Sequence, residues 1–214
     1  NASAGAINIV TRRPGRTAGG FAEASYFSKS EFRGRLGFDL PFSDTLRTRT
    51  IAFYGQYDGN IRNIAPSVDD RVNGYKRYGI RSTVVADLTP DVQLTVIGDW
   101  RRADDDCCAQ LIGTVGTGLA FQVLPTPRGE ETRTISQNLI TRTKETSWGL
   151  SAQIDASLGD HSLTSITAYR SWDNTEIRDG DWLPQPYIGL AQLHDEGPQT
   201  AKTFSQEVRL ASPA

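Results

Sequence analysis

The residues with most potential for chemistry are an acidic run and two adjacent cysteines at positions 104–108. Asp104, Asp105 and Asp106 could offer oxygen ligands to a hard cation, and Cys107 and Cys108 could bind a soft metal as thiolates. Neither set has further ligands nearby in the sequence, so we predict no metal site and interpret the run as the acidic start of a loop. Adjacent cysteines form a disulfide only across a strained peptide, and the role of this pair stays open.

The other candidates for catalysis or cofactor binding are isolated. His161 and His194 are far apart and lack partners at ligand spacing. The glycine-rich stretch Gly113–Gly118 lacks the strand, helix and lysine of a phosphate loop. No serine lies in a nucleophile-elbow pattern. The sequence therefore predicts neither an enzyme nor a bound cofactor.

Composition excludes a helical membrane protein and gives no reason to expect a nucleic-acid-binding protein. Of the 214 residues 37% are hydrophobic, and no apolar run approaches the roughly 18 residues of a membrane-spanning helix. A membrane β-strand needs only about 9 to 11 residues, with apolar side chains on one face. The net charge of -2 gives no electrostatic reason to expect a nucleic-acid partner.

Strands must position whatever site the chain carries, because alternation of apolar and polar residues dominates the sequence. In Phe32–Leu40, for example, Phe32, Leu36 and Phe38 alternate with charged residues, which is the period of a strand with one apolar face. No stretch has the pattern of a long amphipathic helix. We predict about eight strands, at 17–28, 32–40, 46–57, 77–88, 92–101, 147–158, 161–172 and 204–211.

The connections alternate between short and long. Pro41–Asp44, Leu88–Asp91 and Leu158–Asp160 have the composition of tight turns. Transmembrane barrels have short turns on one side and long loops on the other, whereas nothing in a soluble sandwich requires this. The long connections, predicted as polar loops, are Asp58–Gly74, Asp104–Thr143 and Asn174–Lys202; the first outer connection, Ser28–Ser30, is short.

The charges indicate which strand face meets lipid. Arg, Asp and Glu are costly on a lipid-facing surface, so we expect them to point into the lumen of the barrel. Aromatic residues near strand ends on the apolar face are expected to form an interfacial girdle, namely Tyr57, Tyr78, Trp100 and Trp148.

The first fourteen residues resemble the end of the plug domain of TonB-dependent outer-membrane receptors. In that family a small-residue stretch leads into a strand reading Gly-x-Ile-Asn-Ile-x-Thr-Lys/Arg-x-Pro, directly before the first barrel strand. The segments Leu163–Arg170 and Phe204–Ser212 are also similar to recurrent barrel strands of the family. The matching residues are Gly5, Ile7, Asn8, Ile9, Thr11, Arg12 and Pro14.

The resemblance implies an all-β fold: a partial antiparallel transmembrane β-barrel of about eight strands, preceded by the end of a plug domain. Residues 1–15 would be the plug end and residues 16–214 the N-terminal portion of the barrel. Barrels of this family have roughly 22 strands. We therefore expect a fragment that lacks the signal peptide, the TonB-contact segment, most of the plug and the later barrel strands.

The resemblance also implies a function: active uptake across the outer membrane, with a ferric siderophore as the first choice of substrate. Its partners would be the inner-membrane TonB complex, acting on plug parts absent from this chain, and outer-membrane lipid. Loops on a rigid barrel carry recognition, so Arg128, Trp182 and Tyr187 are substrate-binding candidates by residue type. The alternatives are a passive porin, which would have no plug, and a soluble β-sandwich binding module, which would not fractionate with membranes.

Overall fold

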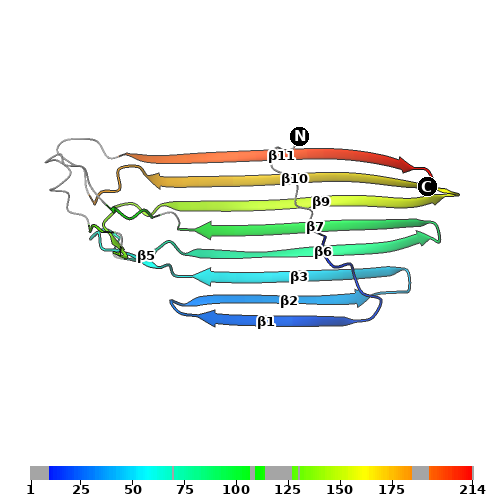
Figure 1. The fold of residues 1–214 in the computed structure, drawn as a ribbon, viewed down its shortest axis with the longest axis horizontal. Coiled ribbons are helices and arrows are strands. Elements are labelled where there is room, and N and C mark those ends of the chain that lie inside the picture. Colours follow the sequence, from blue (N-terminus) through cyan, green and yellow to red (C-terminus); the bar gives the residue numbers. More distant parts are fainter. Residues whose placement is uncertain are drawn as a thin grey trace.

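The chain folds into one long antiparallel sheet and one small sheet (Figure 1). The large sheet has eight strands in the order β1-β2-β3-β6-β7-β9-β10-β11. Its neighbouring strands are all antiparallel, so the predicted all-β class and strand number are confirmed. The part of the chain that the structure describes contains no helix of the length and hydropathy needed to cross a bilayer. The computed structural model describes residues 10–68, 70–106, 109–113, 127–129, 131–184 and 193–213.

The strands of the large sheet differ in length, from 9 residues in β1 to 19 in β10. Turns of a few residues join them at one end, which we term the turn end. At the other end, the loop end, the connections are long except between β1 and β2. The strands are β1 (Gly19–Phe27), β2 (Glu31–Pro41), β3 (Leu46–Tyr57), β6 (Tyr75–Thr89), β7 (Val92–Asp105), β9 (Arg142–Leu158), β10 (His161–Asp179) and β11 (His194–Ala211).

Cross-strand pairing collects the apolar residues on one face of the sheet, which we term the outer face. Leu36 pairs with Ala52, and Ala52 pairs in turn with Ile80. Opposed residues of an antiparallel pair point to the same side, so such rows continue from strand to strand. Large apolar side chains are exposed on this face, including Leu36, Phe38, Leu40, Ile80, Leu150, Ile154, Val208 and Leu210.

One row of the outer face is aromatic, and every strand of the large sheet contributes to it. The ring centroids of Tyr78 and Trp100 are 5.6 Å apart, and those of Trp148 and Tyr169 are 5.4 Å apart. The exposed apolar side chains lie on the turn-end side of this row. We term it the aromatic row: Tyr26, Phe32, Tyr54, Tyr78, Trp100, Trp148, Tyr169 and Phe204.

The opposite, inner face is mostly polar, and one aromatic residue on it corrects a prediction. Tyr57 pairs with Tyr75 on the inner face, so its predicted place in the outer girdle is wrong. The alternation in β3 is ambiguous because Ile51 and Phe53 also point inward. They pack over glycines of neighbouring strands: a Cβ at Gly37 would lie 3.2 Å from Ile51 Cγ1, and one at Gly79 would lie 2.8 Å from Phe53 Cε1.

Two of the predicted long loops are shorter than expected because the strands continue into them. The β10–β11 ladder runs without interruption to the pair Asp179 and His194, so most of 174–202 is strand. The β7–β9 ladder likewise includes Asp104 and Asp105. Beyond the aromatic row both faces of these strands are polar, and the alternation that reveals a strand is therefore lost.

A three-stranded sheet at the loop end consists of β4 (Ile61–Asn63), β5 (Asp70–Val72) and β8 (Thr134–Ile135). It lies within segments predicted as loops and has its own core of Ile61, Val72 and Ile135. Gly59 has a φ of 96°, and a Cβ on it would collide with the Val72 carbonyl, so glycine permits the close approach of the two chain segments. We term this sheet and its attached segments the loop cap.

Candidate functional site

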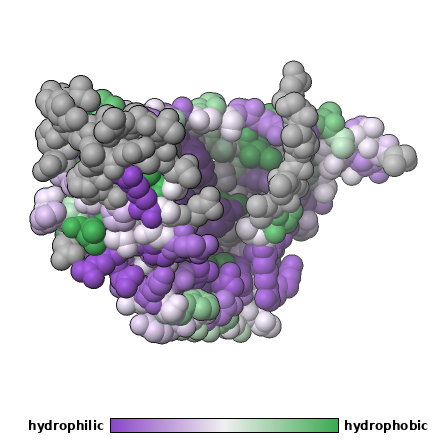
Figure 2. All heavy atoms as spheres, turned by 60° about the vertical axis from the view of Figure 1, so that its left-hand side comes forward, coloured by the Kyte–Doolittle hydropathy of each residue, from purple (hydrophilic) through white to green (hydrophobic). Residues whose placement is uncertain are grey.

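The inner face is lined by ion pairs between neighbouring strands. Arg49 Nη1 lies 2.5 Å from Asp39 Oδ2, with side chains only 9% and 7% exposed. Arg47 Nη1 lies 2.8 Å from Asp87 Oδ2, and Arg170 Nη2 lies 2.9 Å from Asp99 Oδ1. Hydrophilic side chains dominate the face in view in Figure 2 and surround a hollow. The charged side chains of the inner face therefore form ion pairs with one another.

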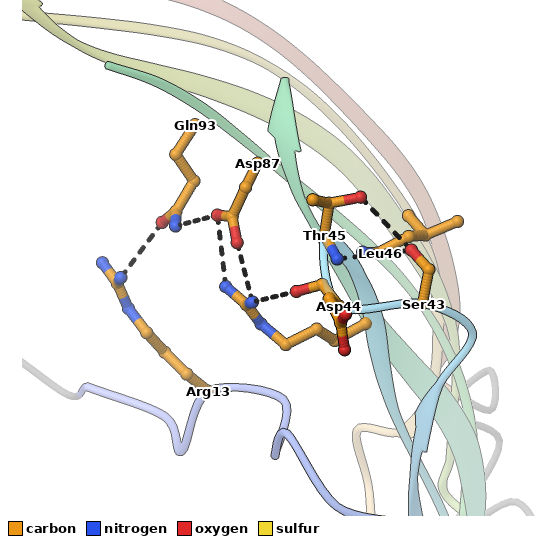
Figure 3. Close-up of polar contacts among 8 residues, drawn as sticks. Arg13, Ser43, Asp44, Thr45, Leu46, Asp87 and Gln93 are labelled. Carbon is orange, nitrogen blue, oxygen red and sulfur yellow. Dashed lines mark hydrogen bonds and ion pairs between the residues drawn. The ribbon is translucent and has the colours of Figure 1, made fainter. Parts of the chain in front are cut away.

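The segment 10–18 lies against this inner face before the chain enters β1 (Figure 3). Arg13 points towards the wall, and its Nη1 donates to Gln93 Oε1 at 3.2 Å. Gln93 Nε2 donates in turn to Asp87 Oδ1 at 2.6 Å, which joins the segment to the Arg47 pair. Pro14 is buried, and the Gly15 amide donates to Asp39 Oδ1 at 3.1 Å.

A hollow of about 630 Å³ lies beside Arg13 at the turn end. Its polar lining includes Arg16, Gln153 and Asp155. Polar side chains of the inner face therefore lie beside the segment 10–18 as well as in contact with it.

A second hollow, of about 620 Å³, lies on the inner face near the loop end, and we term it the rim hollow. Three guanidinium groups line it, those of Arg33, Arg35 and Arg77, together with the rings of Phe53 and Tyr75. Arg77 lies over the Tyr75 ring at 4.8 Å, and the Tyr75 hydroxyl donates to Glu31 Oε1 at 2.9 Å. Each arginine is paired with a carboxylate, Arg33 with Glu31, Arg35 with Glu23 and Arg77 with Asp105, so the hollow has no excess of positive charge. What it offers a ligand is flat guanidinium and aromatic groups side by side.

The loop cap joins the three long connections into one structure. The Ile64 amide donates to the Ile135 carbonyl at 2.9 Å, which links the first connection to the second. The Asn138 amide donates to the Leu183 carbonyl at 3.1 Å, which links the second to the third. Three connections that are separate in sequence are therefore held together at the loop end.

The side chain of Asn63 links two connections of the loop cap through hydrogen bonds. Its side chain is fully buried, and its Nδ2 donates to the Gln137 carbonyl at 2.7 Å. Its Oδ1 accepts the amides of Gln137 at 3.0 Å and Ala65 at 3.1 Å. One side chain thus satisfies three backbone groups that would otherwise be buried without partners.

Replacing Asn63 with alanine is expected to loosen the cap while the large sheet stays folded. Leaving buried backbone groups without partners costs about 1–3 kcal/mol each. Limited proteolysis of the complete protein should then cut within 58–74 or 127–141 at least tenfold faster. Ser67→Ala is the matched control, since Ser67 is exposed in the same connection. Equal cleavage rates for the two variants would contradict this role of Asn63.

The predicted site residues are not brought together at the rim hollow. Arg128 is half-buried in the second connection, where it forms a bridge with Ile112. Trp182 follows β10 with a φ of 56°, and its amide donates to Asp179 Oδ1 at 2.8 Å. Tyr187 lies outside the described residues. The predicted substrate contacts of these three residues stay predictions.

The acidic run at 104–106 divides between strand and cap. Arg142 donates to Asp104 Oδ1 at 2.6 Å, whereas the Gly74 amide donates to Asp106. Burial raises the pKa of Asp106 above its ordinary value, and the Gly74 hydrogen bond acts in the opposite direction. Cys107 and Cys108 lie outside the described residues, which contain no group of three side chains arranged to hold a metal.

Sequence reasoning missed Arg33, Arg35 and Arg77 as a group. The signal was present, because each arginine occupies a polar position of a predicted strand. Only the strand register shows that they line one hollow, and no local pattern reveals that register.

Several solved structures with a similar fold are named as receptors for siderophores or ferric chelates. The chain is similar to the ferric yersiniabactin uptake receptor FyuA from Yersinia pestis, with a TM-score of 0.73 and 17% identity over 97% of this chain and 30% of that one. It is also similar to the ferric-catecholate import receptor Fiu from Escherichia coli K12 in its closed form, with a TM-score of 0.71 and 14% identity over 99% and 31%. The siderophore receptor PiuA from Acinetobacter baumannii is also similar, with a TM-score of 0.67 and 12% identity over 94% of this chain and 28% of that one.

The chain thus spans about three tenths of the length of these receptors. No protein-family model and no curated protein sequence matches it. The comparisons confirm the predicted partial barrel, because the chain shares the fold of the corresponding part of these receptors.

Proposed function

We propose that this chain is part of a TonB-dependent outer-membrane receptor that takes up a ferric siderophore. Residues 1–15 are the end of its plug and residues 16–214 are the N-terminal portion of its barrel. The TonB complex acts through plug residues outside this chain. The observation that carries the proposal is a single sheet with an apolar outer face, a charged inner face and the segment 10–18 seated against that inner face.

The outer face supports a place in the membrane. Along β6 the outward positions from Tyr78 to Ala86 run from the aromatic row across the apolar band. Strands tilted by about 45° with a rise of about 3.3 Å per residue need some ten residues to cross an apolar band about 25 Å tall. An aromatic row bordering an apolar band is typical of the membrane–water interface. A soluble sandwich would cover this face with a second sheet.

The rim hollow supports a substrate of the siderophore class. Its arginines and rings lie on the inner face towards the loop end, the side from which a solute outside the cell would enter. The names of the structurally similar receptors include ferric yersiniabactin, ferric catecholates and siderophores. These receptors are transport proteins, which agrees with a chain that binds and conducts its substrate without converting it.

The test uses the complete receptor in the bacterium that encodes it. Deleting the gene should abolish uptake of a ⁵⁵Fe-labelled siderophore, and dissipating the proton gradient should stop uptake while surface binding persists. The double variant Arg33→Gln, Arg77→Gln should weaken binding of the siderophore at least tenfold, because hydrogen bonds to charged groups contribute about 1.5–3 kcal/mol each. Arg209→Gln is the control, because Arg209 lies on the same inner face near the turn end. Uptake that continues without the proton gradient would favour a porin and contradict the proposal.

A further inference from the structure

Two carboxyl groups meet at the base of the connection between β10 and β11. Asp179 is the last residue of β10 and is only 2% exposed, and Asp181 follows two positions later. Asp179 Oδ1 accepts the amide of Asp181 at 3.2 Å and the amide of Trp182 at 2.8 Å. These hydrogen bonds satisfy one oxygen of the Asp179 carboxyl group.

The other oxygen, Oδ2 of Asp179, is buried and accepts no hydrogen bond from any group that the structure describes. Burying an ionised carboxylate oxygen without a donor is costly, and a second carboxylate beside it adds repulsion. Burial and the negative charge of Asp181 accordingly raise the pKa of Asp179, while the Trp182 amide acts in the opposite direction. Once protonated, Asp179 becomes a donor, and the Asp181 carboxylate lies within hydrogen-bonding reach of its side chain.

The charged groups around this pair do not neutralise it. Arg178 points to the opposite face of the sheet and pairs with Asp195 at 3.0 Å. His194 lies opposite Asp179 in the β10–β11 ladder, but it is exposed and its Nε2 lies 3.3 Å from Asn138 Oδ1. Among the described residues no ion pair joins either carboxyl group to a cation. The charged residues of the adjacent rung, both opposite Ile177, are Arg142, which donates to Asp104, and Glu196.

We propose that Asp179 and Asp181 share a proton, which holds the base of the β10–β11 connection closed. Asp181 also accepts the amides of Leu183 and Leu193, each at 2.9 Å, so the shared proton stabilises a residue that joins both ends of the connection. Loss of the proton places two negative charges side by side, and their repulsion opens the base. Because the Leu183 carbonyl accepts the Asn138 amide, the attachment of this connection to the loop cap then weakens too.

The direction of the pH dependence follows from the burial of Asp179. A carboxyl group whose pKa is raised on folding stabilises the folded form while it is protonated. The base of the connection is therefore most stable at acid pH and loosens as the pH rises through the raised pKa of Asp179. This inference goes beyond the proposed transport function and does not depend on the transported substrate.

The experiment follows amide hydrogen exchange at residues 180–183 of the complete protein by mass spectrometry, with rates corrected for the direct effect of pH. In the wild type, protection should fall about tenfold or more between about pH 5 and about pH 8. Asp179→Asn should stay protected at both pH values, because its Oδ1 can accept the two amides and its Nδ2 is a permanent donor to Asp181. Asp179→Ala should be poorly protected at both. The control Asp195→Asn removes a half-exposed carboxylate from the opposite face and should keep the wild-type pH dependence.

Three results would overturn the inference. The first is wild-type protection that does not change with pH, and the second is Asp179→Asn exchanging as fast as Asp179→Ala. The third is loss of wild-type protection at both pH values on addition of EDTA, which would indicate a divalent cation between the carboxylates in place of a proton. Siderophore uptake is measured separately: a protein without uptake contradicts the proposed function alone, and uptake with pH-independent exchange contradicts the shared proton alone.

Discussion

Replacing Asp39 with alanine is expected to destabilise the receptor by about 3–5 kcal/mol, because it leaves the guanidinium of Arg49 buried without its counter-ion. Asp39 also accepts the Gly15 amide, so the same change releases the segment 10–18 from the wall. The measurement is urea unfolding of the complete protein in lipid vesicles, followed by tryptophan fluorescence. A parallel protease digest of residues 10–18 reports the release of the segment.

The neighbouring pair of Arg35 and Glu23 is the control for this prediction. Its side chains are 56% and 58% exposed, so Glu23→Ala should cost less than about 1 kcal/mol. Replacing Asp39 by alanine and Arg49 by methionine together should recover much of the loss, since no unpaired charge then remains buried. A small effect of Asp39→Ala, equal to that of Glu23→Ala, would show that water reaches Arg49 in the closed barrel.

Replacing Val96 with arginine is expected to cost about 2–4 kcal/mol and to lower the fraction of correctly inserted receptor. Val96 lies midway between Trp100 and Val92 on the outer face, where lipid hydrocarbon would surround the new charge. The measurements are heat-modifiable gel mobility, which reports the folded barrel, and unfolding in vesicles.

The adjacent residue provides the control for Val96. Ile97 points to the inner face, beside a hollow of about 390 Å³ that is also lined by Asp99. Ile97→Arg adds the same charge one position away and should insert normally. If both variants insert equally well, the outer face does not contact lipid, and the membrane assignment fails.

Much of the large sheet was predictable because its strands obey a local rule. Alternation places Ile80 and Arg81 on opposite faces whatever the partner strand is, and the structure confirms this assignment. The assignment failed at Tyr57, where Ile51 and Phe53 fill inner-face space over the glycines of other strands. That packing depends on residues from three strands, which a single-strand pattern does not contain.

The loop cap could not be predicted from sequence for a different reason. β4 and β8 are 3 and 2 residues long and pair in parallel, with Arg62 opposite Thr134. Such short strands have no measurable periodicity, and their partners are far apart in the chain. Asn63 therefore resembled an ordinary loop residue, although it is fully buried between two connections. Arg128 is held by a bridge to Ile112 and the Trp182 amide by a hydrogen bond to Asp179, and neither contact follows from a periodic pattern.

The unequal strand lengths have a consequence for how solutes approach the receptor. The β1–β2 hairpin closes at residues 28–30, directly beyond Tyr26 and Phe32, whereas β10 continues ten positions beyond Tyr169 to Asp179. The hairpin turn itself reaches about three positions beyond Tyr26, so at about 3.3 Å per residue the difference is about 23 Å along the strand. In Figure 1, β10 and β11 at one edge of the sheet reach farther towards the loop end than β1 and β2 at the other edge. In the proposed receptor, a solute adsorbed on the membrane surface would therefore have a lateral route over the hairpin to the inner face, while the extended strands would obstruct the same route beside β10.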